Sequence, residues 1–195
     1  MAQDDPSSQN AHALELLARM ARGDQSALAA FYRLLAPQVN AFALRQLSDP
    51  DEAREVTVDT MHDVWKGAAA FRGDALVRTW VFGIARHKLL DRLRRRPAQR
   101  TVDLDEISEI LPSEDATPFD EIARRQRAGH VAHCMERLSA EHRECVQLVF
   151  FSDLGLAEVA SIQNCPENTV KTRLFHARRN LKRCLETRLE GDRDD

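Results

Sequence analysis

The amino-acid sequence predicts an all-α protein made of two small helical domains joined by a flexible acidic linker. Apolar residues recur at steps of three and four along most of the chain, as in amphipathic helices, and strand-like alternation is nearly absent. Only 7 glycines occur among 195 residues. The segment 97–119 interrupts the helical spacing with prolines and a run of acidic residues, which is typical of a linker.

Four helices are expected in the first half of the chain. The third begins at Asp49-Pro50-Asp51, because this sequence favours a turn and acidic residues stabilise the first turn of a helix. Residues 71–74 separate the third helix from the fourth, which ends near Pro97. The apolar stripes, in order, are Leu14, Leu17, Met20 and Ala21; Leu28, Phe31, Leu34, Leu35, Val39 and Phe42; Ala53, Val56, Thr60, Val64 and Ala68; and Leu76, Trp80, Ile84, Leu89, Leu90 and Leu93.

The domain boundaries follow from these patterns. The polar segment 1–11 is expected to be disordered, and residues 12–97 form the first domain. The linker occupies 98–118, and the second domain, with a helix starting near Phe119, occupies 119–187. The tail 188–195 is expected to be frayed. Helical spacing in the second domain runs through Ile122, Met135, Leu138, Cys145, Val149 and Phe150.

The charge of the chain is unevenly distributed. The formal net charge is −3. However, residues 86–96 carry six basic residues against one acid, and residues 171–183 carry six basic residues and no acid. Because local patches decide phosphate contact, the acidic balance does not exclude nucleic-acid binding.

The chain is expected to act in the cytoplasm without membrane insertion. Its apolar runs are far shorter than the ~20 residues of a membrane helix, and the N-terminus lacks a secretory pattern. Its 4 cysteines form no C-x-x-C pair. In a cytoplasmic protein they are expected to be small buried hydrophobic residues.

Residues 156–185 predict a helix-turn-helix. Asn164 tolerates the left-handed conformation that a tight turn needs, and Pro166 suits the start of the second helix. In such a motif the second helix enters the major groove. An ordinary amphipathic helix with a solvated basic face is the alternative, and the turn residues disfavour it. The second helix is expected to bury Val170, Leu174, Ala177, Leu181 and Leu185 and to expose Asn168, Thr172, Phe175, Arg179 and Arg183.

The stretch 71–88 mixes aromatic and basic residues, which suits unpaired DNA. Apolar pockets can hold an extruded base while Arg and Lys follow the backbone. The alternative is that Trp80 and Phe82 belong to the core, and Trp80 is expected to be at least partly core because it shares a face with Ile84.

Three segments together resemble the extracytoplasmic-function branch of the bacterial sigma-70 family. They are DEAREVTVDTMHDVW at 51–65, FRG at 71–73 with RTWVFGIARHKLLDRLRR at 78–95, and CPENTVKTRLFHARR at 165–179. The resemblance covers residues 12–97 (region 2) and 119–187 (region 4). It implies an alternative sigma factor that binds core RNA polymerase and directs promoter-specific transcription initiation.

The resemblance also implies roles for particular residues. It implies that the helix at 51–66 binds core polymerase and that the loop 67–76 and helix 77–96 melt the minus-ten element. It also implies that the helix at 167–183 binds the duplex minus-thirty-five element. It implies a linker threaded through the polymerase channel and an anti-sigma partner. The expected polymerase-binding residues are Asp51, Glu55, Val58, Asp59 and Trp65; the minus-ten residues are Phe71, Arg72, Arg78, Trp80, Arg86, His87 and Lys88; the minus-thirty-five residues are Asn168, Thr169, Lys171, Thr172, Arg173, Phe175, His176, Arg178 and Arg179.

Two positions depart from the family pattern. Val58 stands where Gln is frequent, so one polymerase contact is in doubt. His87 stands where the family usually has Asn, so the base preference there is in doubt.

Other function classes remain as alternatives. A helix-turn-helix regulator would act on duplex DNA without core polymerase. An enzyme is not expected, since no nucleotide-binding, hydrolase or zinc-protease motif is present, and no cofactor is expected. A metal or redox switch on His130, His133, Cys134, His142, Cys145 or Cys165 is a further alternative, although scattered His and Cys are usually structural.

Overall fold

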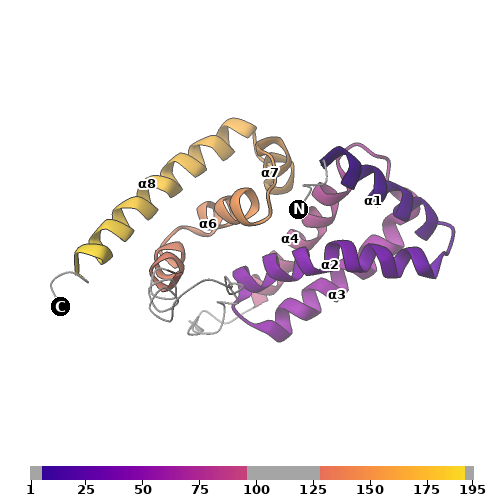
Figure 1. Cartoon of the computed structure of the whole chain (residues 1–195), viewed down its shortest axis with the longest axis horizontal. Helices are drawn as coiled ribbons and strands as arrows, with labels where there is room; N and C mark the ends of the chain where they lie inside the picture. The colour runs from indigo at the N-terminus through magenta and orange to yellow at the C-terminus, as the bar shows by residue number, and fades with distance from the viewer. Residues whose placement is uncertain (1–5, 96–127, 192–195) are drawn as a thin grey trace, which may run out of the picture.

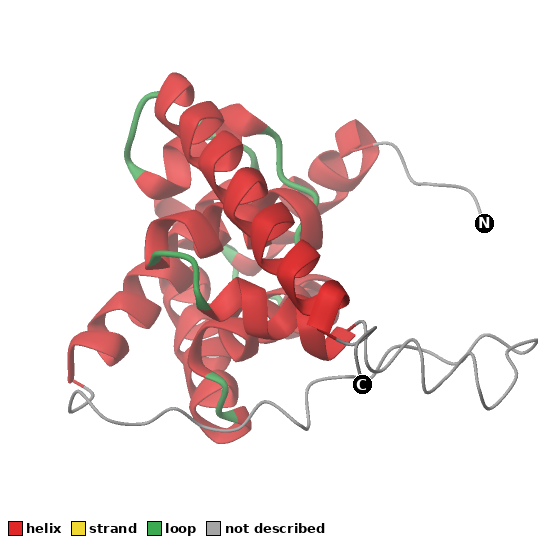
Figure 2. Cartoon of the chain, turned by 90° about the vertical axis from the view of Figure 1, so that its left-hand side faces the viewer, coloured by secondary structure: helices red, strands yellow, loops and turns green. Residues whose placement is uncertain are grey.

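The computed structural model describes residues 6–95 and 128–191, and every regular element in these ranges is helical (Figures 1 and 2). This confirms the all-α fold. The predicted linker 98–118 and the helix start near Phe119 lie outside the described residues. The first domain comprises α1 (Pro6–Met20), α2 (Gln25–Leu47), α3 (Pro50–Gly67), a 3-10 turn (Ala68–Ala70) and α4 (Val77–Arg95); the second comprises helical residues 128–136, α6 (Ala140–Val146), a π-helix (Gln147–Phe151), α7 (Leu156–Gln163) and α8 (Glu167–Gly191).

Aspartates begin two helices of the first domain. The carboxylate of Asp49 accepts hydrogen bonds from the backbone N–H groups of Asp51 and Glu52, both at 3.0 Å. Asp24 caps α2 in the same way and also accepts from Ser26 and Arg19 side chains. The Ser26 hydroxyl and the Arg19 guanidinium therefore hold the pKa of Asp24 far below its usual range.

The buried faces of α2 and α3 agree with the sequence prediction. Phe31, Val39 and Phe42 of α2 are fully buried. On α3, Thr60 is also buried, and its hydroxyl donates to the Val56 carbonyl at 2.7 Å. Because that bond satisfies the hydroxyl, a threonine can occupy a core position without an unpaired polar group.

The expected apolar stripe of α4 is correct only in part: Leu89 is buried and Trp80 is partly core, as predicted, but most of the buried face lies elsewhere. Val77, Val81, Phe82 and Ala85 are buried, whereas Leu76 and Leu93 are exposed and Trp80 and Ile84 are half-buried. The reason is that α4 packs against α2 and α3 on one side and α7 on another. Its buried face is therefore broader than a single stripe, and the larger residues at 80 and 84 lie at its edge.

Both ends of the chain contain more helix than expected. Residues 6–11, predicted to be disordered, form the start of α1. The Asn10 side chain accepts a hydrogen bond from the Val77 N–H at 2.9 Å, which links α1 to the start of α4. At the other end α8 continues to Gly191, so residues 188–191, which were expected to be frayed, are helical, and the rest of the predicted tail lies outside the described residues.

The cysteines depart partly from the expectation of buried thiols. Cys145 is a buried free thiol, and burial raises its pKa to about 11. Cys165 is a half-buried free thiol. Cys134 and Cys184 instead form a disulfide that joins the helical residues 128–136 to α8. The prediction failed because 50 residues separate the two half-cystines, so only the folded domain brings them together.

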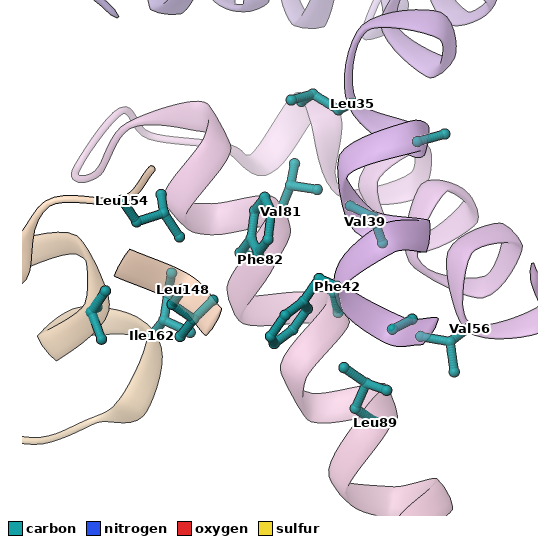
Figure 3. Close-up of a cluster of buried hydrophobic side chains, with 14 of the residues drawn as sticks. Leu35, Val39, Phe42, Val56, Val81, Phe82, Leu89, Leu148, Leu154 and Ile162 are labelled. Carbon is teal, nitrogen blue, oxygen red and sulfur yellow. The ribbon is translucent and has the colours of Figure 1, made fainter. Parts of the chain in front are cut away.

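The two domains pack directly against each other and share one continuous apolar core. Figure 3 shows Phe82 of α4 between Phe42 and a group of side chains from the second domain, Leu148, Leu154 and Ile162. All five are buried. None of the described helices is long and apolar enough to cross a lipid bilayer.

Candidate polymerase and promoter interfaces

The expected polymerase-binding residues share one exposed face of α3. Val58 and Trp65 are 51% and 48% exposed, which is unusual for large apolar side chains on a helix with a well-packed opposite face. Asp51, Glu55 and Asp59 flank them and are exposed. This face is thus an acidic surface with an apolar centre, and no described helix covers it.

At the side of α3 that borders α4, two of its acids bind basic residues of α4. Asp63 pairs with Lys88 at 2.5 Å, and Glu55 pairs with Arg92 at 2.5 Å. The Lys88 ammonium, expected at the minus-ten surface, is therefore held toward α3, with its side chain 29% exposed.

The loop after α3 and the first turns of α4 form a pocket with aromatic walls. The rings of Phe71 and Trp80 lie 4.8 Å apart and line a pocket of about 570 Å³. A Cβ at Gly67 would lie 3.1 Å from the Trp80 ring, so glycine allows the ring its close approach to the end of α3. Gly73 has φ +79°, a left-handed conformation that glycine adopts readily. Arg72 lies in this loop with an exposed side chain, and its Nε lies 3.2 Å from a carboxylate oxygen of Asp74.

His87 lies on the same side of α4 and also lines the pocket. Its side chain is 77% exposed, and Nδ1 lies 3.5 Å from an Asp91 carboxylate oxygen. The structure thus brings together Phe71, Arg72, Trp80 and His87.

Arg78 and Arg86 of α4 face the second domain. Arg86 binds Glu144 of α6 at 2.8 Å, and the two side chains are only 21% and 9% exposed. Arg78 donates to the Asp153 carbonyl at 2.8 Å and lies 3.6 Å from Glu158 of α7. These arginines are therefore hydrogen-bonded within the protein.

The helix-turn-helix is formed as predicted by α7, a tight turn and α8. Asn164 has φ 50° and ψ 52°, the left-handed conformation expected of it. Pro166 lies just before α8, and its carbonyl accepts from Thr169 at 2.9 Å. Val170, Leu174 and Ala177 are buried, while Leu181 and Leu185 are half-buried.

The outer face of α8 is exposed over its first half. Phe175 is 62% exposed, and Lys171 is exposed with a salt bridge to Glu167 at 2.8 Å. The same face exposes Asn168, Thr172, His176, Arg178 and Arg179. Thr169 is half-buried at its edge.

Arg173 differs from its neighbours because it points toward α7. Its guanidinium donates to the Gln163 side-chain oxygen at 2.7 Å, and Gln163 in turn donates to Glu144 at 2.7 Å. The chain of contacts Arg86–Glu144–Gln163–Arg173 links α4 to α8.

Sequence reasoning missed the acidic partners of α4 and an aromatic pair. Glu158 has a recognisable local role, since its carboxylate accepts from the Gly155 N–H at 2.9 Å in a capping box. No pattern in the sequence marks Glu144 as a partner of α4.

Phe150 and Phe151 are 52% and 50% exposed, although Phe150 was expected on a buried stripe. The π-helix shifts the register there.

The residues proposed for a metal switch do not converge. Cys134 is disulfide-bonded, and the Cys145 thiol contacts the Val170 carbonyl at 3.7 Å. Among the residues that the structure describes, no group of three or more His, Cys, Asp or Glu is arranged to hold a metal ion.

Comparison with known proteins identifies both domains. Residues 31–99 match the family model "Sigma-70 region 2", and residues 130–181 match "Sigma-70, region 4". The ECF RNA polymerase sigma factor SigK of Mycolicibacterium vanbaalenii is 32% identical over 175 residues, which cover 87% of each chain.

Two solved structures share the fold. CnrH in complex with the cytosolic domain of CnrY has a TM-score of 0.67 at 22% identity and covers 90% of this chain and 98% of its own. The sigma factor RpoE of Bartonella quintana, in complex with the anti-sigma factor NepR, has a TM-score of 0.63 at 23% identity and covers 80% and 94%. On the two region matches and the similarity to SigK, the chain belongs to the extracytoplasmic-function branch of the sigma-70 family of transcription initiation factors.

Proposed function

We propose that this sigma factor docks on core RNA polymerase through the exposed face of α3 and contacts two promoter elements through separate domains. The observation that carries the proposal is that two basic helical surfaces, one on each domain, accompany an acidic and apolar surface on α3. Family membership supports action with polymerase over that of a helix-turn-helix regulator that works alone.

The α8 surface suits the duplex minus-thirty-five element. The N-terminal half of a recognition helix faces base edges in the major groove. Lys171 can donate to guanine, and Thr172 and Phe175 can contact a thymine methyl. Arg178 and Arg179 lie further along the helix, where they suit phosphate contacts that set register.

The loop 71–76 and α4 suit the unpaired minus-ten strand. The pocket beside Phe71 and Trp80 offers apolar walls to an extruded base, and His87 lies at its side to form hydrogen bonds with base edges. Arg72 is exposed where it can contact the strand's phosphates. Arg78 and Arg86 can do so only after they leave Asp153, Glu158 and Glu144.

An anti-sigma protein is the expected regulator. The structurally similar RpoE of Bartonella quintana was solved in complex with the anti-sigma factor NepR, and CnrH with the cytosolic domain of CnrY. The exposed apolar residues Val58 and Trp65 on α3 give a partner of this kind a surface that it can mask. Action with polymerase also places the protein in the cytoplasm.

The polymerase surface is tested by Val58→Asp, which puts a charge at the apolar centre of the α3 face. We expect this variant to lose at least tenfold in affinity for core polymerase, since an unpaired charge in an interface costs more than about 1.4 kcal/mol. Ala69→Asp, at an exposed site just beyond α3, is the matched control. Binding is measured with purified core enzyme in the absence of DNA. Equal affinity of both variants and wild type would refute the α3 assignment.

A further inference from the structure

Two neighbouring phenylalanines of the second domain, Phe150 and Phe151, are about half exposed. They are the last two residues of the π-helix Gln147–Phe151. Short π-helical turns are rare and occur frequently at functional sites. A pair of exposed aromatic rings is unusual because burial of each ring would stabilise the fold. What the two rings contact therefore bears on function.

Each ring lies against the guanidinium of an arginine. Cζ of Arg178 lies 5.0 Å from the ring centroid of Phe150, and Cζ of Arg45 lies 4.8 Å from the ring centroid of Phe151. Both distances are within the range of about 6 Å over which a cation is attracted to an aromatic face. The two contacts differ in the helix that they reach, because Arg178 belongs to α8 and Arg45 to α2.

The Arg178 guanidinium keeps its hydrogen-bond donors available. Among the residues that the structure describes, the ion pairs of α8 are Lys171 with Glu167 and Lys182 with Glu186, and Arg178 belongs to neither. Its side chain is exposed. An aromatic ring accepts no conventional hydrogen bond, so the contact with Phe150 leaves the five N–H groups of the guanidinium free to donate to an anion.

Arg178 lies on one exposed stripe of α8 with three other proposed or neighbouring groups. Lys171, Phe175, Arg178 and Lys182 follow one another at steps of 4, 3 and 4 residues, which places them on one side of the helix. All four are exposed. The Phe150 ring therefore holds Arg178 on the side of α8 that also carries Lys171 and Phe175, both proposed to read the minus-thirty-five element.

Holding the guanidinium in place favours its binding to a phosphate. A long side chain that moves freely loses rotamer freedom when it binds, and this loss weakens the contact. A ring that already restricts the guanidinium lowers the loss. The planar fork of an arginine then meets the phosphate oxygens with a defined geometry.

We propose that Phe150 is a positioning residue whose ring holds the Arg178 guanidinium ready to bind a phosphate of duplex DNA. This inference rests on the proposed role of α8 at the minus-thirty-five element. Phe150 acts through Arg178 and reads no base, since a phosphate contact sets the register of a protein on the duplex without carrying sequence information.

The test uses holoenzyme assembled from core polymerase and full-length variants at position 150. Phe150→Ala removes the ring, Phe150→Leu keeps apolar bulk without an aromatic face, and Phe150→Trp keeps the face. Phe151→Ala, which removes the adjacent ring beside Arg45, is the matched control. Fluorescence anisotropy at low temperature, where the duplex stays paired, measures binding of two labelled duplexes. One is selected by wild-type holoenzyme from a pool randomised at the minus-thirty-five element, and the other has that element scrambled.

We expect Phe150→Ala and Phe150→Leu each to weaken binding roughly two- to fivefold, the range of an exposed cation–π contact. Phe150→Trp and Phe151→Ala should bind as wild type does. The selected and scrambled duplexes should weaken by the same factor, because a phosphate contact acts uniformly across sequences. A distorted helix-turn-helix would instead reduce the preference for the selected duplex.

Double variants test whether Phe150 acts through Arg178. In the Arg178→Ala background, Phe150→Ala should weaken binding no further, whereas in the Arg179→Ala background it should keep its full effect. Circular dichroism should show the same helix content for all variants.

Three outcomes would overturn the inference alone: wild-type affinity in Phe150→Ala, rescue by Phe150→Leu, or an undiminished effect of Phe150→Ala in the Arg178→Ala background. Arg178→Ala itself should weaken binding and lower the slope of log affinity against log salt concentration by about one. Failure of that variant to do so would refute the phosphate role proposed for Arg178, and the inference with it.

Discussion

The two basic helices of this protein, α4 and α8, differ in what covers them. On α8, Phe175 is 62% exposed and the basic residues around it face solvent. On α4, Arg86 is 21% exposed and bound to Glu144. A run of basic residues in a sequence therefore predicts a positively charged helix face. It does not show whether acidic residues of the folded chain already pair with that face.

Their positions in the fold explain the difference. Helix α4 is central, with α2 and α3 on one side and α7 on another, so much of its surface meets protein. Helix α8 packs through one stripe on α6 and α7 and has no described element beyond its outer face (Figure 1). The outer face of α8 is thus exposed to solvent, whereas much of the basic surface of α4 is covered by the second domain.

The largest expected effect concerns the stability of the domain that carries α8. Cys134→Ser/Cys184→Ser removes a cross-link between half-cystines 50 residues apart, which should lower the free energy of unfolding by about 4 kcal/mol through loop entropy. Both tryptophans, Trp65 and Trp80, lie in the first domain. Denaturant unfolding followed by circular dichroism should therefore shift more than unfolding followed by tryptophan fluorescence. A coincident shift in both would show that the domains unfold as one unit.

The next effect concerns the pocket on α4. Trp80→Ala removes a ring that can stack on an extruded base, a contact worth about 1–3 kcal/mol. Open-complex formation, followed by permanganate reactivity of unpaired thymines, should fall by roughly ten- to a hundredfold. Trp80→Phe should retain most of the wild-type open-complex formation. If the alanine variant opens promoters as well as wild type, the pocket has no part in melting.

A smaller effect is expected at the start of α3, whose outer face is the proposed polymerase surface. Asp49→Ala removes an acceptor for two backbone N–H groups and should cost about 1 kcal/mol of stability. Asp51→Ala, at an exposed side chain two residues further on, serves as the control and should cost less. Thermal unfolding of the two variants measures the difference in stability. An equal loss of stability in both would show that Asp49 does not cap α3.

The smallest effect concerns the thiol under α8. Burial raises the pKa of Cys145 to about 11. At pH 8 nearly all Cys145 side chains are neutral thiols, so iodoacetamide should modify the half-buried Cys165 first. Modification of Cys145 should increase as the pH rises toward 11, since the thiolate is the nucleophile. Mass spectrometry of peptides separates the two sites, and early labelling of Cys145 would contradict its burial.

Most of the helices, the turn at Asn164 and the exposed face of α8 could be predicted because each depends on local spacing, and the outer residues of α3 were expected from the family resemblance. The broad buried face of α4 could not, since it depends on which elements pack around that helix. The same holds for the Cys134–Cys184 bond and for the pairing of Arg86 with Glu144, which join residues 50 and 58 positions apart. Local periodicity carries no information about such contacts.

If the two domains read separate promoter elements together with core polymerase, run-off transcription over two promoter libraries should separate their contributions. One library is randomised at the minus-thirty-five element and the other at the minus-ten element. Lys171→Ala/Phe175→Ala should change sequence preference only in the first library, and His87→Asn only in the second. Unchanged upstream preference in the α8 variant, or transcripts whose sequence dependence is the same in both variants and wild type, would refute the assignment of one promoter element to each domain.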